Sequence, residues 1–182
     1  MTTVVAHKTS KGVTWGWDSL MVTGNQAEVM VNQKVFVNRG LIYGVAGSLR
    51  ALDVVQYAEF PHYDEEEELD ARKWLITKWV PYVLDNFKDI PGMLTEDGEL
   101  DGCSILIGTR DEVFAIDGRL SVSHTPSGVH AMGSGGDYAM GAVMAGATVI
   151  EALHIAGNFD PYSGGAYTTV TASSYLDSHS IV

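Results

Sequence analysis

The stretch that decides the fold is MTTVVAHKTSKGVTWGWD, residues 1–18. Residues 2–8 and 13–17 are rich in β-branched and aromatic side chains, and a turn-like SKG trio separates them, so the sequence predicts a β-hairpin. We expect this hairpin to hold Thr2 in a strand and to bring Asp18 back toward it. Met followed by Thr is also where an N-terminal threonine nucleophile is made, because removal of Met1 gives Thr2 a free α-amine beside its hydroxyl.

Composition predicts one globular domain that spans residues 1–182, of which 174–182 form a polar tail. Hydrophobic residues make up 46% of the chain and charged residues 19%, and 182 residues can bury a substantial core. The net charge of −12 argues against a nucleic-acid partner and against binding to anionic membranes. The single cysteine, Cys103, excludes an intrachain disulfide and a multi-cysteine metal site. The chain has no long apolar run and no signal-peptide pattern, so we expect a cytoplasmic protein.

Outward from the hairpin, the sequence predicts strands at 34–38 and 41–46, a helix from 49 to about 60, and an amphipathic helix that runs to about Lys88. Pro81 should kink this second helix or mark a boundary in it. Residues 64–68, DEEEE, fit a solvated loop or the acidic first turn of that helix, with a metal or cationic-partner site as the alternative.

The second half begins with a polar loop at 89–102 and continues with short antiparallel strands and small-residue helices. The pattern predicts strands at 103–108, 112–116, 120–123 and 129–132, helices at 137–146 and 149–158, and a last strand at 166–171. Thr148 is the expected N-cap of the second of these helices. This order of elements favours two antiparallel sheets covered by helices, an α+β layered sandwich.

Several motifs follow the N-terminal threonine in a fixed order. They are Asp18 after the second strand, Lys34-Val35, Ala46-Gly47, GSGGDYA at 133–139 and DPYSGG at 160–165. Each has an ordinary structural explanation when taken alone, as a turn residue, a strand lysine or a glycine-rich loop. Together, over residues 2–173, they resemble the proteasome β-subunit and HslV group of N-terminal-nucleophile (Ntn) hydrolases. The resemblance implies a four-layer αββα sandwich.

The resemblance also implies a role for each matched residue. Thr2 would be the nucleophile, with its own α-amine as the base, and Lys34, ion-paired with Asp18, would lower the pKa of its hydroxyl. The Gly47 N–H would stabilise the oxyanion, and Ser134, Asp160 and Ser163 would surround the α-amine. No metal or cofactor is needed. Residues expected to shape the substrate pocket are Met21, Phe36, Val45 and Arg50, which suggests an apolar preference.

These expectations describe a threonine endopeptidase that acts on peptides or unfolded polypeptides. The resemblance further implies a homo-oligomer, as a ring or stacked assembly, served by a separate ATPase unfoldase. Two alternatives remain open. The chain could be a catalytically silent structural or regulatory subunit that retains Met1, because an amide nitrogen at Thr2 cannot act as the base. It could also be an Ntn amidase with a small non-peptide substrate.

Overall fold

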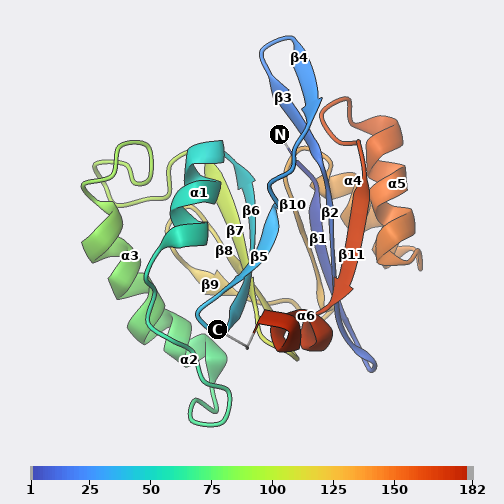
Figure 1. Ribbon diagram of the computed structural model, residues 1–182. Helices are drawn as coiled ribbons and strands as arrows, with labels where there is room; N and C mark the ends of the chain where they lie inside the picture. The colour runs from blue at the N-terminus through green and yellow to red at the C-terminus, as the bar shows by residue number, and fades with distance from the viewer. Residues whose placement is uncertain (1, 180–182) are drawn as a thin grey trace.

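Two antiparallel β-sheets face each other in the centre of the computed structural model, which describes residues 2–179 (Figure 1). Met1 lies outside the described residues, as do residues 180–182. Helices cover the outer face of each sheet, so the layers run helix, sheet, sheet, helix. The four-layer αββα sandwich predicted from the sequence is confirmed.

The first sheet contains the N-terminal hairpin, whose strands pair in the predicted way. Its order is β10 (Val129–Met132), β1 (Val4–Thr9), β2 (Gly12–Asp18) and β11 (Tyr167–Thr171). In the hairpin, Val4 pairs with Trp17 and Thr9 with Gly12. The end of β2 therefore returns to the beginning of β1, as the sequence indicated.

The second sheet contains five strands, all antiparallel. Its order is β5 (Val35–Asn38), β6 (Leu41–Gly47), β7 (Cys103–Gly108), β8 (Val113–Ile116) and β9 (Val122–Ser123). The sequence predicted four consecutive antiparallel strands from residue 103 onward. The fourth of them, β10, instead crosses to the first sheet, where it pairs with β1.

Side-chain alternation along the strands divides the interior into three cores. On β1, Val4 and Ala6 point into the space between the sheets, whereas Val5 points toward the outer helices α4 (Gly136–Met144) and α5 (Val149–Phe159). Thr148 caps α5 and forms a capping box with Glu151, as expected for its N-terminus. The third core lies between the second sheet and its own helices.

The first helix on the second sheet is shorter than the sequence predicted, and the second runs close to its predicted end but contains a π-helical turn. The helical elements are α1 (Leu49–Tyr57), α2 (Ala71–Trp74), η1 (Leu75–Trp79) and α3 (Val80–Phe87). Pro81 has no N–H to donate to the carbonyl four residues earlier, so the regular ladder cannot continue through it. The π-helical turn η1 ends where α3 begins, which is the boundary that Pro81 predicted. The helix expected to reach residue 60 ends at Tyr57.

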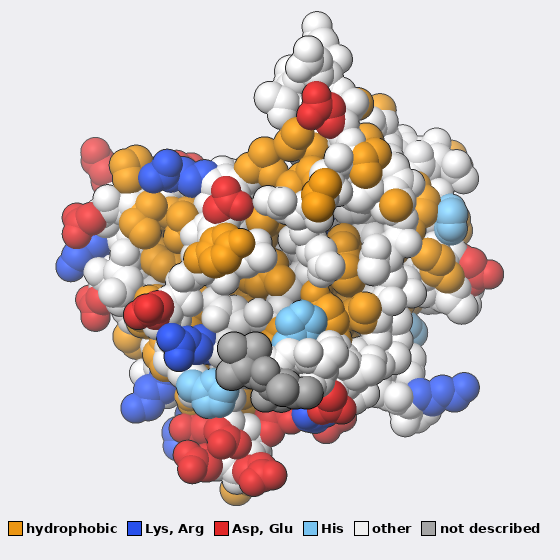
Figure 2. All heavy atoms as spheres, in the orientation of Figure 1, with side chains coloured by type: hydrophobic (Ala, Val, Ile, Leu, Met, Phe, Trp, Pro, Cys, Tyr) orange, Lys and Arg blue, Asp and Glu red, His pale blue; other side chains and the backbone are white. Residues whose placement is uncertain are grey.

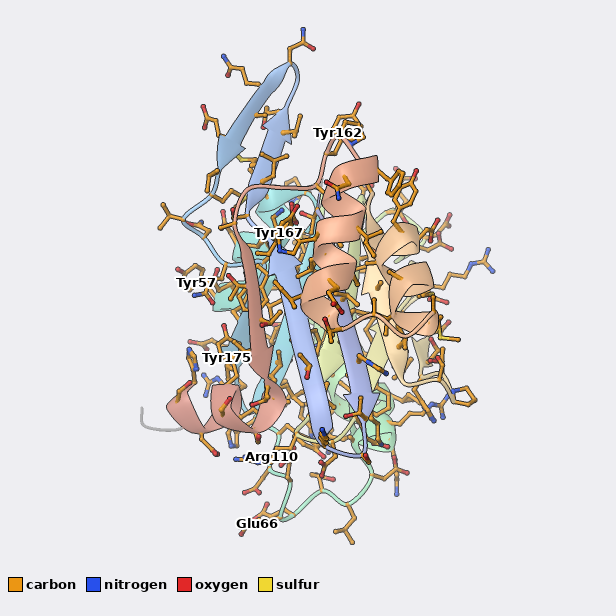
Figure 3. All side chains as sticks on the ribbon, turned by 90° about the vertical axis from the view of Figure 1, so that its right-hand side faces the viewer. Tyr57, Glu66, Arg110, Tyr162, Tyr167 and Tyr175 are labelled. Atoms are coloured by element: carbon orange, nitrogen blue, oxygen red, sulfur yellow. The ribbon has the colours of Figure 1, made fainter. Side chains whose placement is uncertain are left out.

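Two elements were not predicted. A hairpin of β3 (Leu20–Thr23) and β4 (Gln26–Val29) projects from one end of the molecule, and β3 begins shortly after β2 ends (Figure 1). The tail expected from residue 174 is helical up to His179, in α6 (Ala172–His179), which follows β11 at the foot of the sheet (Figure 3). Its buried residues Ala172, Tyr175 and Leu176 have helical spacing and close the core between the sheets.

The acidic run at 64–68 forms a turn and not a helix, which agrees with the solvated-loop interpretation. Figure 2 shows carboxylates gathered at this end of the molecule, and Figure 3 places Glu66 there, not far from Arg110. Glu65 pairs with Arg110 at 3.1 Å, while the N-cap of α2 is Asp70, outside the run. Among the described residues, no helix is long and apolar enough to span a membrane.

Candidate active site

Thr2 lies at the entrance to β1, at the end of the molecule that carries the β3–β4 hairpin (Figure 1). It is 5% exposed, so its position is set by packing and not by solvent. Gly133 presses against its backbone: a Cβ on Gly133 would lie 1.8 Å from the Thr2 carbonyl oxygen, and the φ of Gly133 is +88°. Only glycine fits there, which explains why the GSG motif begins with a glycine beside Thr2.

Asp18 and Lys34 form the buried ion pair that the sequence predicted, with 2.9 Å between Lys34 Nζ and Asp18 Oδ1. The side chains are 0% and 2% exposed respectively. Asp18 Oδ1 also accepts a bond from the Thr3 N–H at 2.8 Å. Its other oxygen accepts one from the Gly164 N–H at 2.9 Å. The carboxylate thus ties the beginning of β1, Lys34 and the DPYSGG loop together.

The environment of Lys34 destabilises its charged form. Burial lowers the pKa of Lys34 below its ordinary value, and the nearby Asp18 carboxylate offsets only part of this effect. Lys34 also donates to the Leu20 carbonyl at 2.6 Å. The bonds to Asp18 and to the Leu20 carbonyl hold the ammonium group beside the cavity that Thr2 and Lys34 line.

A chain of hydroxyl groups converges on Asp160. Ser134 Oγ donates to Asp160 Oδ2 at 2.6 Å, and Ser163 Oγ donates to the same oxygen at 2.5 Å. Because a carboxylate only accepts, the single proton of Ser163 is committed to Asp160. Thr3 Oγ1, which lies 2.6 Å from Ser163 Oγ, must therefore be the donor to Ser163.

Asp160 is held in its ionised form by these bonds. Burial alone would raise its pKa, but the bonds from Ser134, Ser163 and the Tyr162 N–H outweigh burial and keep the pKa of Asp160 below its ordinary value. The three residues predicted around the α-amine, Ser134, Asp160 and Ser163, are thus brought together at the N-terminal threonines.

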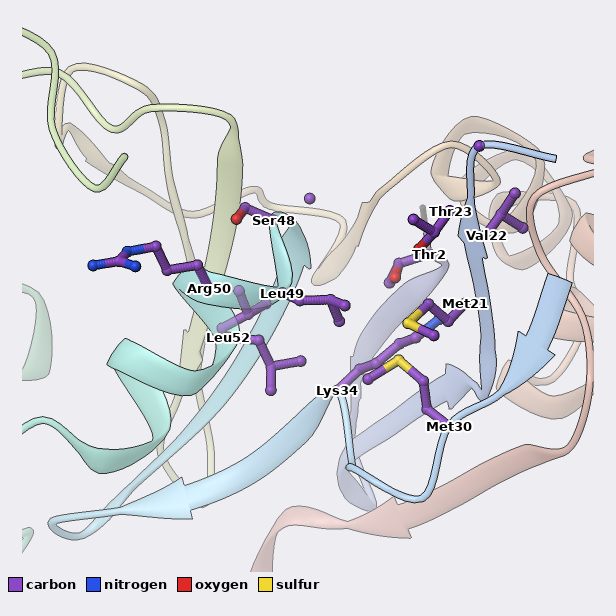
Figure 4. A pocket seen from close by; sticks show the side chains of 13 residues that line it. Thr2, Met21, Val22, Thr23, Met30, Lys34, Ser48, Leu49, Arg50 and Leu52 are labelled. Carbon is purple, nitrogen blue, oxygen red and sulfur yellow. The ribbon is translucent and has the colours of Figure 1, made fainter. Parts of the chain in front are cut away.

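Two cavities meet at Thr2 and Gly47. One, of about 420 Å³, is also lined by Lys34 and by side chains from β3 and α1 (Figure 4). The other, of about 360 Å³, is bordered by Cys103 and by the Gly133–Ser134 loop. Gly47 has a φ of +112°, and a Cβ there would lie 2.2 Å from the Gly102 carbonyl oxygen. The corner between β6 and α1 therefore requires glycine, and the residue is exposed to both cavities.

Three of the four predicted pocket residues line the larger cavity, namely Met21, Val45 and Arg50. In Figure 4 the guanidinium group of Arg50 points away from Thr2. The prediction for Phe36 is wrong. Phe36 is 5% exposed and lies in the core under the helices, with its ring stacked on Tyr43 at 6.0 Å. Alternation along β5 sends Phe36 to that face and Val35 to the space between the sheets.

The structure adds residues that sequence reasoning did not select. Met30, Leu49 and Leu52 line the larger cavity, and Thr3 and Gly164 bond to the buried polar groups described above. A signal for Met30 was present, because Gly24-Asn25 is a two-residue hairpin turn that predicts β3 and β4. The second threonine of the TT pair gave no comparable signal, since its role depends on contacts with residues about 160 positions away.

Comparison with family models and with curated proteins finds no match for this chain. Comparison with solved structures finds BPH of Thiobacillus denitrificans in complex with epoxomicin, with a TM-score of 0.76 and 20% identity over 92% of this chain and 96% of that one. BPH of the same organism also matches in a second structure, with a TM-score of 0.70 and 18% identity over 92% and 96% of the two chains.

Eukaryotic HslV from Trypanosoma brucei matches with a TM-score of 0.65 and 19% identity, over 92% of this chain and 97% of that one. These likenesses extend over nearly the whole of both partners, although the identities are low. The chain therefore has the fold of HslV and of BPH, which is the fold that the motifs of its sequence indicated.

Proposed function

We propose that this chain is an N-terminal threonine peptidase, active once the peptide bond before Thr2 has been cleaved. One observation carries the proposal: Thr2 lies where the cavity containing the Asp18–Lys34 pair meets the cavity bordered by Gly133 and Ser134. A nucleophile, a cationic group and a polar network beside two connected openings are the parts that acyl transfer requires.

In the proposed reaction, Thr2 Oγ attacks the substrate carbonyl carbon while the α-amine of Thr2 takes the hydroxyl proton, directly or through a water molecule. The Lys34 ammonium stabilises the developing alkoxide, and the Gly47 N–H donates to the oxyanion of the tetrahedral intermediate. The α-ammonium then protonates the leaving amine as the C–N bond breaks. An ester remains on Thr2, and water, deprotonated by the α-amine, hydrolyses it to release the carboxylic acid.

The network around Asp160 is suited to hold the α-amine. The hydroxyl proton of Ser134 is used in the bond to Asp160, so the free lone pairs of Ser134 Oγ can accept a bond from an ammonium group. The ionised Asp160 carboxylate adds a favourable charge interaction with that ammonium. In this proposal Ser134, Asp160 and Ser163 position the base and do not touch the substrate.

The larger cavity favours an apolar substrate side chain at the cleaved bond. Six of the side chains in its lining are apolar, those of Met21, Val22, Met30, Val45, Leu49 and Leu52. None of the described residues that line it is Asp or Glu, while Lys34 contributes a positive charge. We therefore expect leucine-like side chains to bind best there and basic side chains to bind worst.

We also propose that the chain works in the cytoplasm as a homo-oligomer, a ring or stacked assembly fed by a separate ATPase. The support is a set of exposed apolar side chains: Val31 is 95% exposed after β4, and Tyr138 of α4 stacks on Phe159 of α5, which is 66% exposed. Sedimentation equilibrium would test this. Phe159→Ser should weaken association if α4 and α5 pack against another copy, and a chain that is monomeric at every concentration refutes the assembly.

The experiment that tests the peptidase combines intact mass with hydrolysis of peptides. A chain that begins at Thr2 should cleave a fluorogenic peptide with an apolar residue before the scissile bond, and should gain the mass of epoxomicin, the ligand of the T. denitrificans structure. Thr2→Ala should abolish both, whereas Thr2→Ser should retain part of each. A chain beginning at Thr2 that neither hydrolyses peptides nor reacts supports the silent subunit, and activity confined to small amides supports the amidase.

A further inference from the structure

A cavity of about 500 Å³ lies at the opposite end of β1 from Thr2. Lys8 of β1 and Glu112, the residue before β8, line it from the two sheets. His124 and His130 line it from the segments on either side of the β9–β10 turn. In Figure 1 the tip of the β1–β2 hairpin points away from the β3–β4 hairpin, so this cavity is remote from the candidate active site. The six-residue length of β1 sets the separation at about 20 Å.

His130 is the most informative residue of this cavity. It is 4% exposed and points into the space between the sheets, yet within residues 2–179 its imidazole makes no hydrogen bond. The nitrogens of His130 are not among the fully buried polar atoms that lack a partner, so the imidazole meets solvent only where it borders the cavity. Since His130 borders the cavity, a molecule bound there could provide the missing bond.

The other groups around the cavity are mainly donors of hydrogen bonds and positive charge. Lys8 lies 4.0 Å from Glu112, the limit for an ion pair, and both side chains are 47% exposed, so Glu112 neutralises Lys8 only weakly. His124 is exposed and close enough to His130 for their charges to interact. In a chain with 11 Lys and Arg against 23 Asp and Glu, this cavity has one lysine against one glutamate, with two histidines beside them.

The wall of the cavity is preformed. Residues 125–128, TPSG, make a tight turn closed by the Gly128 N–H to the Thr125 carbonyl at 3.0 Å. The turn is fixed to β1 by a bond from the Lys8 N–H to the Gly128 carbonyl at 2.8 Å. Gly128 has a φ of +67° and packs against the Lys8 backbone, where a Cβ would lie 2.9 Å from the carbonyl oxygen. The hydroxyls of Thr125 and Ser127 are therefore held beside the two imidazoles.

We propose that this cavity is a binding site for a small oxyanion, a tetrahedral anion or a carboxylate, held by the Lys8 ammonium and the imidazoles of His124 and His130. Charge-assisted bonds to an anion would provide His130 with its missing partner and offset the repulsion between the two histidines. A metal ion is not the expected ligand, because the described residues contain no cluster of three or more metal-binding side chains. The site does not depend on the function proposed for Thr2.

The site predicts a definite pH dependence. The titratable and charged groups that face it are Lys8 from β1, Glu112 just before β8 and the two histidines. Burial and then the charge of His124 lower the pKa of His130, so His130 is mainly neutral near neutral pH. A bound anion favours protonated imidazole, which means that binding takes up protons and tightens as the pH falls. Uptake of one proton changes the affinity by at most about tenfold per pH unit.

Sulfate is the probe for the tetrahedral class, because its charge does not change between about pH 6 and about pH 8. The imidazole NMR signals of the full-length chain would be followed during titration with sodium sulfate, and in a second arm with sodium acetate, at constant ionic strength maintained with sodium chloride. The titration is carried out at about pH 6 and at about pH 8. We expect the signals of His124 and His130 to shift saturably, with binding at least about threefold tighter at about pH 6 than at about pH 8. Saturation by sulfate alone or by acetate alone identifies the class of oxyanion.

Variants separate a built site from general charge. Lys8→Met should weaken binding by about fivefold or more, whereas Lys11→Met, which removes the same charge from the neighbouring turn outside the cavity, should leave it within about twofold. His130→Gln should reduce the pH dependence of anion binding, and Thr2→Ala should leave the affinity for the anion unchanged. If neither anion gives a saturable shift, if affinity is equal at both pH values, or if the two lysine variants behave alike, the proposal is wrong. Lys8 is half exposed, so its variant remains informative even if His130→Gln does not fold.

Discussion

Removing the ammonium group of Lys34 should destabilise the protein strongly, because it leaves the Asp18 carboxylate charged and buried. In Lys34→Met, Asp18 keeps two backbone donors, the N–H groups of Thr3 and Gly164, but loses the Lys34 ammonium group at 2.9 Å. Both side chains are at most 2% exposed, so water cannot take the place of the ion pair. Breaking a buried pair in this way costs about 3–5 kcal/mol of the free energy of unfolding.

Removing both charges should cost much less than the two single changes together. Asp18→Asn alone leaves the Lys34 ammonium buried without its counter-ion, although the Leu20 carbonyl still accepts from it. The double variant Asp18→Asn/Lys34→Met buries no net charge. We expect the coupling between the two positions to recover about 2–3 kcal/mol relative to the sum of the single variants.

The assay is urea unfolding followed by tryptophan fluorescence, for which the chain offers four tryptophans. Lys78→Met, a change at an exposed lysine, is the matched control and should shift the free energy of unfolding by less than about 0.5 kcal/mol. Peptide hydrolysis should be lost in both single variants and remain lost in the double variant, even though its stability returns. A loss below about 1 kcal/mol in Lys34→Met, or strict additivity of the two changes, refutes this account of the pair.

Three further predictions follow from the geometry around Thr2. Gly133→Ala should lower the free energy of unfolding by about 2 kcal/mol or more in urea, because φ is +88° and the new methyl would collide with the Thr2 carbonyl; an unchanged midpoint contradicts this. Asp160 has a lowered pKa, so its stabilisation is present above the ordinary value of 3.8 and is lost as the pH falls below it; acid unfolding of Asp160→Asn should therefore depend less on pH in that range, and parallel curves would contradict the assignment. If protonated Lys34 assists catalysis, its lowered pKa means that the rate of peptide hydrolysis should begin to fall, as the pH rises, before pH 10.5, the ordinary value for lysine. A pH–rate profile that stays flat up to that value would exclude this role.

The features that could be predicted from the sequence are those set by local patterns. The β1–β2 hairpin, the strands flanking the turn at residue 40 and the capped helix α5 all depend on short-range alternation, turn residues and capping. The sheet to which β10 belongs is different. Its residues have the same alternation whether they pair with β9 or with β1, and the choice depends on which long-range pairing closes the first sheet. Local pattern contains no information about that choice.

Phe36 shows how one residue separates a core position from a pocket position. Phe36 is only two residues after Lys34, which lines the cavity. This short separation does not place both side chains in the cavity, because the strand begins between them. Lys34 precedes β5, and from Val35 onward the strand alternates, so Phe36 faces the helices whereas Val35 faces the other sheet. The pocket wall expected from Phe36 comes instead from Met30, in the segment after a hairpin that was not predicted.

The position of Thr3 connects the stability of this fold with its proposed chemistry. The Thr3 N–H bonds to Asp18, and its hydroxyl donates to Ser163, so one residue joins the ion pair to the hydroxyl network. Gly135 packs against the same hydroxyl, since a Cβ there would lie 2.1 Å from Thr3 Oγ1. A change at Thr3 should therefore disturb both groups around Thr2 without touching a substrate. The bonds of Thr3 to Asp18 and Ser163 hold the adjacent Thr2 in place, and for this reason a residue at the beginning of a strand can be as fixed as one in the core.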